Sequence, residues 1–328
     1  MRQISDEGLR VLSNTEQQYR YYVDAIKELN ALPDNMKWKI ISGKTYLYAI
    51  TGVIEKSLGR RTTETEAVMA GFEKNKEDLT ARILSIKGRL AQSLAQYKAL
   101  NLPRMMSLPA KILREMDERS MLGSVYLVVG TNAIFAYEVE SGERAPANIA
   151  ETEDVDFSAL KSESNYSLLS ILKKVDQTFE VNSHGRHQAS NQDAYEVEVL
   201  CSPTTSPVLK GGFVPSPMRG QEWLAMGRPV AHVVAGLDGK PAPIVAPDPR
   251  YMALHKLWLS TLPDRNQLKV KKDKEQGTWL LDVIKRKMPI SYPMDEDFLS
   301  GLPNELRKAL DEHATNVILP PVPLSLRF

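Results

Sequence analysis

The chain has 328 residues, of which 42% are hydrophobic and 25% charged, and its 42 Lys and Arg residues nearly balance its 41 Asp and Glu residues. This composition is typical of a folded globular protein and excludes a disordered chain, while a net charge of +1 gives no whole-chain reason to expect a nucleic-acid or membrane binder. The length predicts two or three domains.

Cysteine content and apolar runs indicate where the protein resides. Cys201 is the single cysteine, so no intramolecular disulfide can form, which favours a reducing compartment. The opening MRQISDEGLR has no apolar segment typical of a signal peptide, and no run reaches the roughly 18 apolar residues of a membrane span. We therefore predict a cytoplasmic protein without a membrane partner.

Residues 1–120 are predicted to form a helical N-terminal region. Its clearest signal is a set of apolar residues at steps of three and four, namely Leu79, Ile83, Ile86, Leu90, Leu94, Tyr97 and Leu100. TETE at 63–66 predicts a capping box at the start of this helix, and Pro103 marks its end. The stripe is short for a dimeric coiled coil, so we expect it to pack within the chain.

Residues 121–203 are predicted to form an α/β core. The expected strands are 125–129, 153–157, 178–181 and 194–200, and the expected helices are 131–141 and 166–175. Segments 142–150 and 183–192 are expected to be loops. Residues 204–328 are predicted to begin with a hairpin around 236–239 and to continue with helices at 249–262, 264–287 and 303–314.

Two pairs of carboxylates stand out in the expected strands. Asp154 and Asp156 alternate, so their side chains project from one face, and Glu196 and Glu198 do the same. Burying such carboxylates is costly unless cations neutralise them, and Mg²⁺ ions bridging a nucleoside triphosphate are one solution. An exposed edge strand is the alternative that this pattern alone favours. Pairing of the two strands would make a three-carboxylate cluster, but the sequence does not specify the pairing.

Gly130 and Thr131 lie between an expected strand and an expected helix. A glycine there lets the backbone approach a phosphate, and the helix start offers free N–H groups. The same turn is common in α/β proteins without phosphate ligands, so by itself it is a weak signal.

Taken in order, these motifs resemble the polymerase-β nucleotidyltransferase superfamily. They are more closely similar to a family of bacterial nucleotidyltransferases related to the abortive-infection type. The resemblance is carried by VGTNAIFAYE at 129–138, DVD at 154–156 and AYEVEVL at 194–200, and it extends over about residues 45–290, including SLGR at 57–60 and HKL at 255–257.

The resemblance implies an α+β fold in which a polymerase-β-type core, a small mixed sheet with helices, is flanked by helical N-terminal and C-terminal regions. It implies an enzyme that transfers a nucleoside monophosphate from an NTP to an acceptor hydroxyl, on tRNA or a protein for instance, and releases pyrophosphate. Two Mg²⁺ ions would be held by the catalytic carboxylates of Asp154, Asp156 and Glu198, with Glu196 as the fallback for the third.

The resemblance also implies residues that bind the nucleotide, and these are Gly130, Thr131, Lys256, Lys272 and Asp273. Departures from the family pattern keep an alternative open. The third carboxylate is Glu rather than Asp, and Gly130 is 24 residues from Asp154 because of a long loop. The alternative is a non-catalytic module of the same fold that binds RNA or a protein partner.

Basic and histidine-containing segments outside these motifs each allow two interpretations. The run KVKKDK at 269–274 is predicted to be a solvated helix face, with a phosphate or tRNA-like surface as the alternative. An RNA contact at Arg60 and Arg61 is a less favoured alternative to a simple helix start. His184 and His187 lack the spacing of a zinc site, and contact of Arg186 or His187 with a substrate is the more plausible interpretation.

Overall fold

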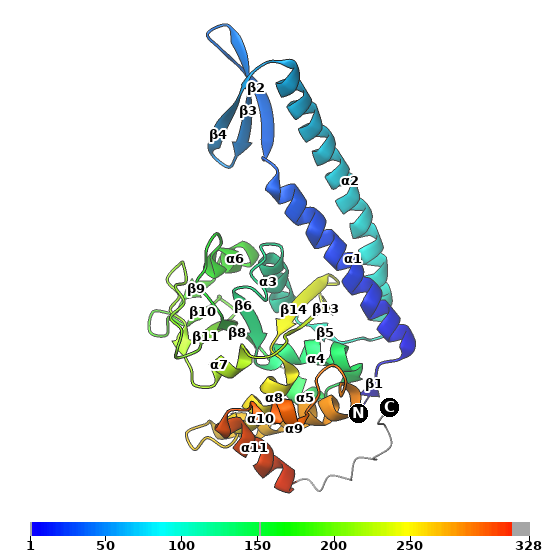
Figure 1. Cartoon of the computed structure of the whole chain (residues 1–328), viewed down its shortest axis with the longest axis vertical. Coiled ribbons are helices and arrows are strands. Elements are labelled where there is room, and N and C mark those ends of the chain that lie inside the picture. The colour runs from blue at the N-terminus through cyan, green and yellow to red at the C-terminus, as the bar shows by residue number, and fades with distance from the viewer. Residues whose placement is uncertain (1, 151, 317–328) are drawn as a thin grey trace.

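A computed structural model of the chain describes residues 2–150 and 152–316. It consists of a body of helices and sheets and of a long arm that projects from the body (Figure 1). Within these ranges, no helix combines the length and apolar character that crossing a membrane would need.

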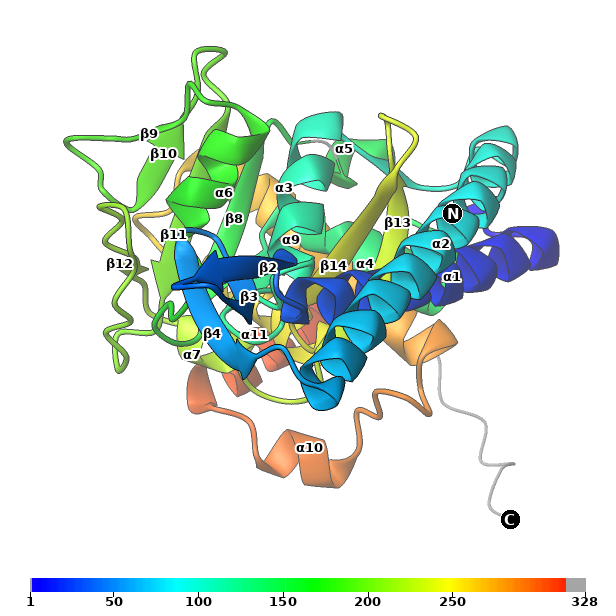
Figure 2. The same cartoon turned by 90° about the horizontal axis from the view of Figure 1, so that it is seen from above.

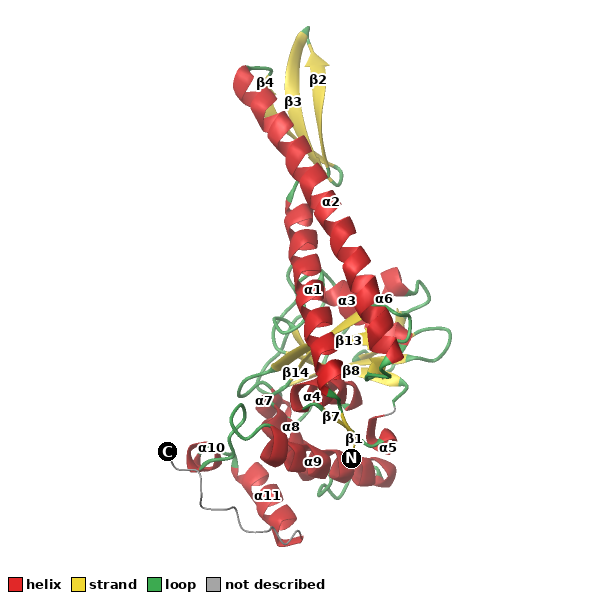
Figure 3. Cartoon of the chain, turned by 90° about the vertical axis from the view of Figure 1, so that its right-hand side faces the viewer, coloured by secondary structure: helices red, strands yellow, loops and turns green. Residues whose placement is uncertain are grey.

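The arm is a pair of antiparallel helices with a small sheet at its end. The chain leaves the body along α1 (Asp6–Ala31) and returns along α2 (Thr63–Ala99) (Figures 1 and 3). Between them lies the tip sheet, which has the order β2-β3-β4 and consists of β2 (Asn35–Ile41), β3 (Lys44–Thr51) and β4 (Ile54–Arg60). Thr62 and Thr65 form the capping box of α2, so the box lies one residue earlier than the predicted 63–66.

The tip sheet corrects the prediction that residues 1–120 are helical. Aromatic and β-branched residues alternate with others along β3, which suits a pleated strand better than a helix. Gly43 and Gly52 have φ values of 72° and 58° in the two connecting turns, which glycine adopts without strain. The helical prediction rested on the apolar stripe of α2, and it does not extend to residues 35–60.

The body contains a mixed sheet, called here the body sheet, in the order β6-β8-β11-β10-β9 with β12 paired to β11. Its strands are β6 (Tyr126–Val129), β8 (Asp154–Ala159), β9 (Glu180–Val181), β10 (Gln188–Ser190), β11 (Glu196–Cys201) and β12 (Ser216–Pro217). β8 and β11 are parallel, whereas β6 and β10 run antiparallel to their neighbours. The predicted loop 183–192 thus contains a strand, β10.

Smaller sheets complete the body. The hairpin predicted around 236–239 joins β13 (Val230–Gly236) to β14 (Pro241–Ala246), and β5 (Arg104–Met105) pairs with β13. β1 (Arg2–Gln3) pairs with β7 (Glu143–Arg144). The predicted loop 142–150 contains β7 and a short helix, α5 (Ala147–Ala150).

The remaining helices surround the sheets (Figure 2). They are α3 (Ser107–Asp117), α4 (Ile134–Ser141) after a 3₁₀ turn η1 (Thr131–Ala133), α6 (Leu168–Val175), α7 (Gln221–Leu224), α8 (Pro249–Leu259), α9 (Gln267–Lys287), α10 (Glu296–Ser300) and α11 (Asn304–Asn316). Asp248 caps α8 by accepting a hydrogen bond from the backbone of Arg250, with Pro249 in the first turn as expected. Helices predicted at 131–141, 166–175, 249–262, 264–287 and 303–314 are all present, and the domain division at residues 120 and 203 stays a prediction.

The base of the arm shares the core of the body. Val11 and Tyr19 of α1 and Leu90 and Tyr97 of α2 belong to the same hydrophobic cluster as the body strands and helices. The stripe from Leu79 to Tyr97 is buried and α2 packs against α1, whereas Leu100 follows α2 and is exposed. The stripe therefore packs within the chain, as predicted.

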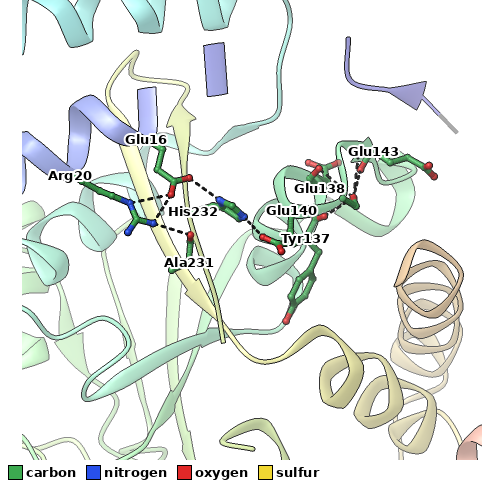
Figure 4. Close-up of polar contacts among 9 residues, drawn as sticks. Glu16, Arg20, Tyr137, Glu138, Glu140, Glu143, Ala231 and His232 are labelled. Carbon is green, nitrogen blue, oxygen red and sulfur yellow. Dashed lines mark hydrogen bonds and ion pairs between the residues drawn. The ribbon is translucent and has the colours of Figure 1, made fainter. Parts of the chain in front are cut away.

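A partly buried histidine adds a polar contact between arm and body (Figure 4). The ring of His232 on β13 contacts Glu16 of α1 through Nδ1 at 2.8 Å and Glu140 of α4 through Nε2 at 2.6 Å. Arg20 of α1 donates to the carbonyl of Ala231 next to it at 3.4 Å. Burial lowers the pKa of His232, but the hydrogen bonds and charges of Glu140 and Glu16 outweigh burial and raise the pKa to about 9. The imidazolium therefore bridges two carboxylates at neutral pH.

Candidate active site

The two carboxylate-bearing strands are neighbours. β8 and β11 pair in parallel, with Asp154 opposite Glu196 and Asp156 opposite Glu198. Laterally paired residues project from the same face of a sheet, so all four carboxylates share one face. The pairing that the sequence left open is thus present.

Of the two glutamates, Glu198 lies with Asp156. Both line one small pocket, whereas Glu196 is exposed at the start of β11. Burial, followed by the nearby charges of Asp154 and Glu198, raises the pKa of Asp156 to about 7. The cluster therefore holds like charges close together with too little water to screen them.

Gly130 fits against Asp156 in a way that no other residue could. It follows β6, whose last residue Val129 pairs with Asp156 on β8. Its φ of 65° and ψ of −151° lie in a region that is essentially reserved for glycine. A Cβ added there would be 2.0 Å from Oδ2 of Asp156. The glycine thus allows the backbone to pass directly beside the carboxylate.

Thr131 opens the 3₁₀ turn after Gly130, and its side chain is directed into the protein. Its hydroxyl accepts a hydrogen bond of 3.2 Å from the amide of Gln276 on α9, which also donates to the carbonyl of Ile149 at 2.8 Å. Asn132 then donates to the carbonyl of Asp154 at 2.7 Å. These bonds hold the turn between α9 and the start of β8, and neither Gln276 nor Asn132 carried a signal in the sequence that predicted this role.

An ion cluster around the buried Asp273 lies on α8, α9 and the turn between them. Asp273 contacts Nζ of Lys256 at 2.8 Å and the guanidinium of Arg265 at 2.6 Å. Burial raises the pKa of Asp273, but the two cations outweigh it and hold the pKa below its usual value. Asp273 therefore acts on Lys256 and Arg265 by holding them in place.

The carboxylates and the cations face one another across the same pocket. Its volume is about 80 Å³, and its charged and glycine lining consists of Gly130, Asp156, Glu198, Lys256, Arg265 and Lys269. This is less than the roughly 300–1,000 Å³ of a pocket that encloses a whole small-molecule ligand. A polyphosphate end would fit the cationic wall, with the remainder of a nucleotide outside.

A family model described as nucleotidyltransferase matches residues 108–299, which is more than half of the chain. The chain belongs to this nucleotidyltransferase family. Searches of curated proteins and of solved structures found no match. The predictions of a nucleotidyltransferase and of an α+β fold are therefore confirmed at this level.

The range shared with the nucleotidyltransferase family contains every element of the pocket. β6, β8, β11, α8 and α9 all fall within residues 108–299, and the arm lies before it. Of the residues that the sequence analysis assigned to the nucleotide, Gly130 and Lys256 line the pocket, whereas Thr131 and Asp273 hydrogen-bond to other protein groups. Lys272 lies near the pocket. Burial lowers the pKa of its side chain, and the charges of Lys256, Asp154 and Asp273 also affect this pKa.

Arg265 and Lys269 are pocket residues that the sequence analysis did not select. Lys269 belongs to the run 269–274, which was predicted to be a solvated face, and the side chain of Lys271 in that run is indeed 82% exposed. Arg265 lies in the turn between α8 and α9, where no motif marks it. Helical periodicity could have separated Lys269 from Lys271, since they lie about 200° apart around a helix.

His255 is a further pocket residue, which the sequence analysis noted within HKL at 255–257 but to which it gave no role. It is buried, and neither ring nitrogen has a hydrogen-bond partner among the described residues. Burial and then the charge of Lys256 lower the pKa of His255 to about 3. The imidazole is therefore neutral beside the cationic wall.

His187 lies at the other side of the carboxylates. Its Nε2 is 3.4 Å from Oε1 of Glu198. Within residues 2–150 and 152–316, no group of three or more Asp, Glu, His and Cys side chains is arranged to hold a metal ion as it stands. The oxygen donors of Asp154, Asp156 and Glu198 nevertheless have the chemistry that Mg²⁺ prefers.

Proposed function

We propose that the protein is a Mg²⁺-dependent nucleotidyltransferase of the polymerase-β superfamily, related to the abortive-infection type. It transfers a nucleoside monophosphate from an NTP to an acceptor hydroxyl. The acceptor oxygen forms a bond to the α-phosphorus, the bond from that phosphorus to the β-phosphate oxygen breaks, and pyrophosphate leaves while the hydroxyl proton passes to solvent. The enzyme class is that of nucleotidyl-group transfer. The acceptor is either an RNA, such as tRNA, or a protein.

One observation carries this proposal. The parallel register of β8 and β11 brings Asp156 and Glu198 side by side, with Asp154 two residues away on the same face. The backbone at Gly130 passes against Asp156 so closely that no side chain fits there. Catalytic carboxylates beside a glycine turn are what transfer at a triphosphate requires.

The donor set supports Mg²⁺ at this site. Asp154, Asp156 and Glu198 offer only oxygen ligands. Burial, followed by the charges of Asp154 and Glu198, raises the pKa of Asp156, and a divalent cation would offset both effects. Bound there, Mg²⁺ would lower the pKa of the attacking hydroxyl and stabilise the charge that develops on the phosphate. Two ions are proposed, with Glu198 as the third carboxylate.

The other pocket residues would act on the triphosphate. Lys256, Arg265 and Lys269 present cations opposite the carboxylates, and Asp273 keeps the first two oriented. The Gly130 turn would let phosphate oxygens approach backbone N–H groups. The cations would thus bind and orient the triphosphate, while the carboxylates would hold Mg²⁺ at its α-phosphorus.

A non-catalytic binding module of the same fold is the second candidate. It is favoured by the side-chain positions, because no described set of three ligands is arranged for a metal ion. Such a module would keep the sheet and the cationic wall and bind RNA or a protein partner without transfer.

Transfer from each labelled NTP to total RNA and to protein tests the proposal. We expect Asp154→Ala and Asp156→Ala to abolish transfer and to leave the melting temperature unchanged or raised, since carboxylate repulsion is relieved. Normal transfer by both variants would show that the site is elsewhere.

A thermal-shift comparison separates the two candidates. A shift produced by an NTP only with Mg²⁺ supports the enzyme. No shift with any NTP, together with binding to RNA or a partner, supports the module.

A further inference from the structure

The tip sheet concentrates positive charge. Residues 35–61 contain six of the 42 basic residues and one of the 41 acidic residues, so the rest of the chain has 36 basic and 40 acidic residues. The sheet lies at the far end of the arm, away from the body (Figures 1 and 3). It also precedes the range that matches the nucleotidyltransferase family.

One face of the sheet carries most of this charge. Lys37 lies beside Tyr48 in the register. Lys39 lies beside Tyr46, which has Arg60 on its other side. Paired residues project from the same face, and so do residues two apart on one strand. The register therefore defines a face, called here the basic face, that holds Lys37, Lys39, Lys44, Tyr46, Tyr48 and Arg60.

Cations and rings are in contact on the basic face. Nζ of Lys39 lies 5.0 Å from the ring centre of Tyr48. The one acidic residue, Glu55, shares the face, where it pairs with Lys37 at 3.1 Å and with Lys39. Lys44 is exposed beyond this pair. Four cations against one carboxylate leave the face with three net positive charges.

The arm packs against part of the opposite face, around Leu47. Leu47 is the only buried residue of β2, β3 and β4, and its side chain projects from this opposite face. Its neighbour Gly59 faces Thr65 of α2, since a Cβ there would lie 3.9 Å from that side chain. The guanidinium of Arg61 lies 5.2 Å from the ring centre of Trp38 on this face. The basic face is therefore turned away from α2 and open to a ligand.

We propose that the basic face binds a single-stranded stretch of nucleic acid. Spaced cations on a surface neutralise successive phosphates, and planar rings between them offer stacking platforms for unpaired bases. A sheet that displays aromatic rings among basic residues meets both needs of such a ligand. An acidic peptide would use the cations and leave the rings without a role.

The consequence for transfer is that the arm would hold a polynucleotide acceptor. This consequence rests on the proposed function, whereas binding at the tip sheet does not. RNA and DNA share the phosphates and bases that the face would recognise, so both belong in the test.

The role of charge on the basic face is tested by measuring Kd. The anisotropy of labelled 20-nucleotide single-stranded RNA or DNA is followed as the full chain is added, at low salt and without NTP. We expect Lys44→Glu to raise Kd by about five-fold or more. Lys56→Glu is the matched control, because it makes the same charge change on the opposite face of the same sheet, and we expect a change of less than about two-fold. Equal weakening by both variants would overturn the proposal.

Stacking is tested at the tyrosines. Tyr46→Ala with Tyr48→Ala should raise Kd by about ten-fold or more, whereas Phe at both positions should restore binding, because the ring is kept. Glu55→Gln should lower Kd, because it frees Lys37 and Lys39, and it does so without removing any packing group. Unchanged binding in the alanine variant, or equal competition by a polyglutamate peptide, would contradict base stacking and the proposal with it.

The same measurement on Asp156→Ala separates this inference from the proposed function. Binding should be unchanged in that variant, because Asp156 is in the body. Transfer without binding at the tip would overturn the inference alone, and binding without transfer would overturn only the proposed activity.

Discussion

The body sheet and the tip sheet differ most in what surrounds their charged residues. In the body sheet, Val155 and Val197 are fully buried on one face, and Asp156 and Glu198 lie on the other face in a narrow pocket. In the tip sheet, only Leu47 is buried, and cations gather on an open face. The two sheets thus carry opposite charge in opposite environments.

This difference separates stability from binding. A buried charge is costly unless another charge compensates it, so the body should respond to each change with a large loss of stability or activity. Exposed charges interact weakly through water, so the tip should tolerate changes without unfolding. Substitutions in the body and in the tip sheet test whether the two regions differ in this way.

The largest effect is expected from Asp273→Asn in the body. This change leaves two cations, the buried Lys256 and the partly buried Arg265, without their shared carboxylate. Loss of one partner of a buried ion pair costs about 3–5 kcal/mol, so the free energy of unfolding should fall by that amount in urea denaturation. Transfer should fall as well, because both cations lose their orientation. A loss below about 1 kcal/mol would mean that this cluster behaves like a surface pair.

Gly130→Ala should follow. Its φ of 65° and a Cβ at 2.0 Å from Asp156 combine backbone strain with a steric clash. These effects should lower the free energy of unfolding by about 2–4 kcal/mol and transfer by at least roughly a hundred-fold. Gly52→Ala in the tip sheet is the control, because its φ is 58° but no atom lies within 4 Å. It should cost about 1 kcal/mol and leave transfer unchanged; similar losses in both variants would show that the backbone conformation alone matters.

A smaller, pH-dependent effect is expected at the joint of arm and body. The pKa of His232 in the folded protein is about 9, above its usual 6.5, so its contribution to stability is fully present below pH 6.5. The contribution is lost as pH rises through 9. We expect His232→Gln to cost about 2 kcal/mol at pH 6 and much less at pH 10, in urea denaturation at each pH. Parallel stability curves for the variant and the natural chain would contradict the bridge.

The smallest effect is expected from Glu55→Gln in the tip sheet. Its pairs with Lys37 and Lys39 are solvent-exposed, so the midpoint of urea denaturation should stay the same as in the natural chain. A loss as large as that of Asp273→Asn would show that the tip sheet depends on its charges for folding.

Much of the body was predictable because its signals are local. Alternation in a strand was enough to put Asp154 and Asp156 on one face, and steps of three and four were enough to define the buried stripe of α2. The helices of the C-terminal region were predictable for the same reason. The tip sheet was missed, because the helical prediction was extended from the apolar stripe of α2 to residues 35–60, where β3 has a strand pattern and Gly43 and Gly52 lie in the turns.

The sequence by itself determined most helices and several strands of the body, the faces of the carboxylates and the basic composition of residues 35–61. Only the tertiary structure decided that β8 and β11 are neighbours, since about 40 residues separate them and pairing depends on long-range packing. It also decided that Glu198 rather than Glu196 lies beside Asp156, and that Asp273 binds Lys256 and Arg265. Local propensity reports which face a side chain is on, whereas its partner is selected by burial and charge across the whole fold.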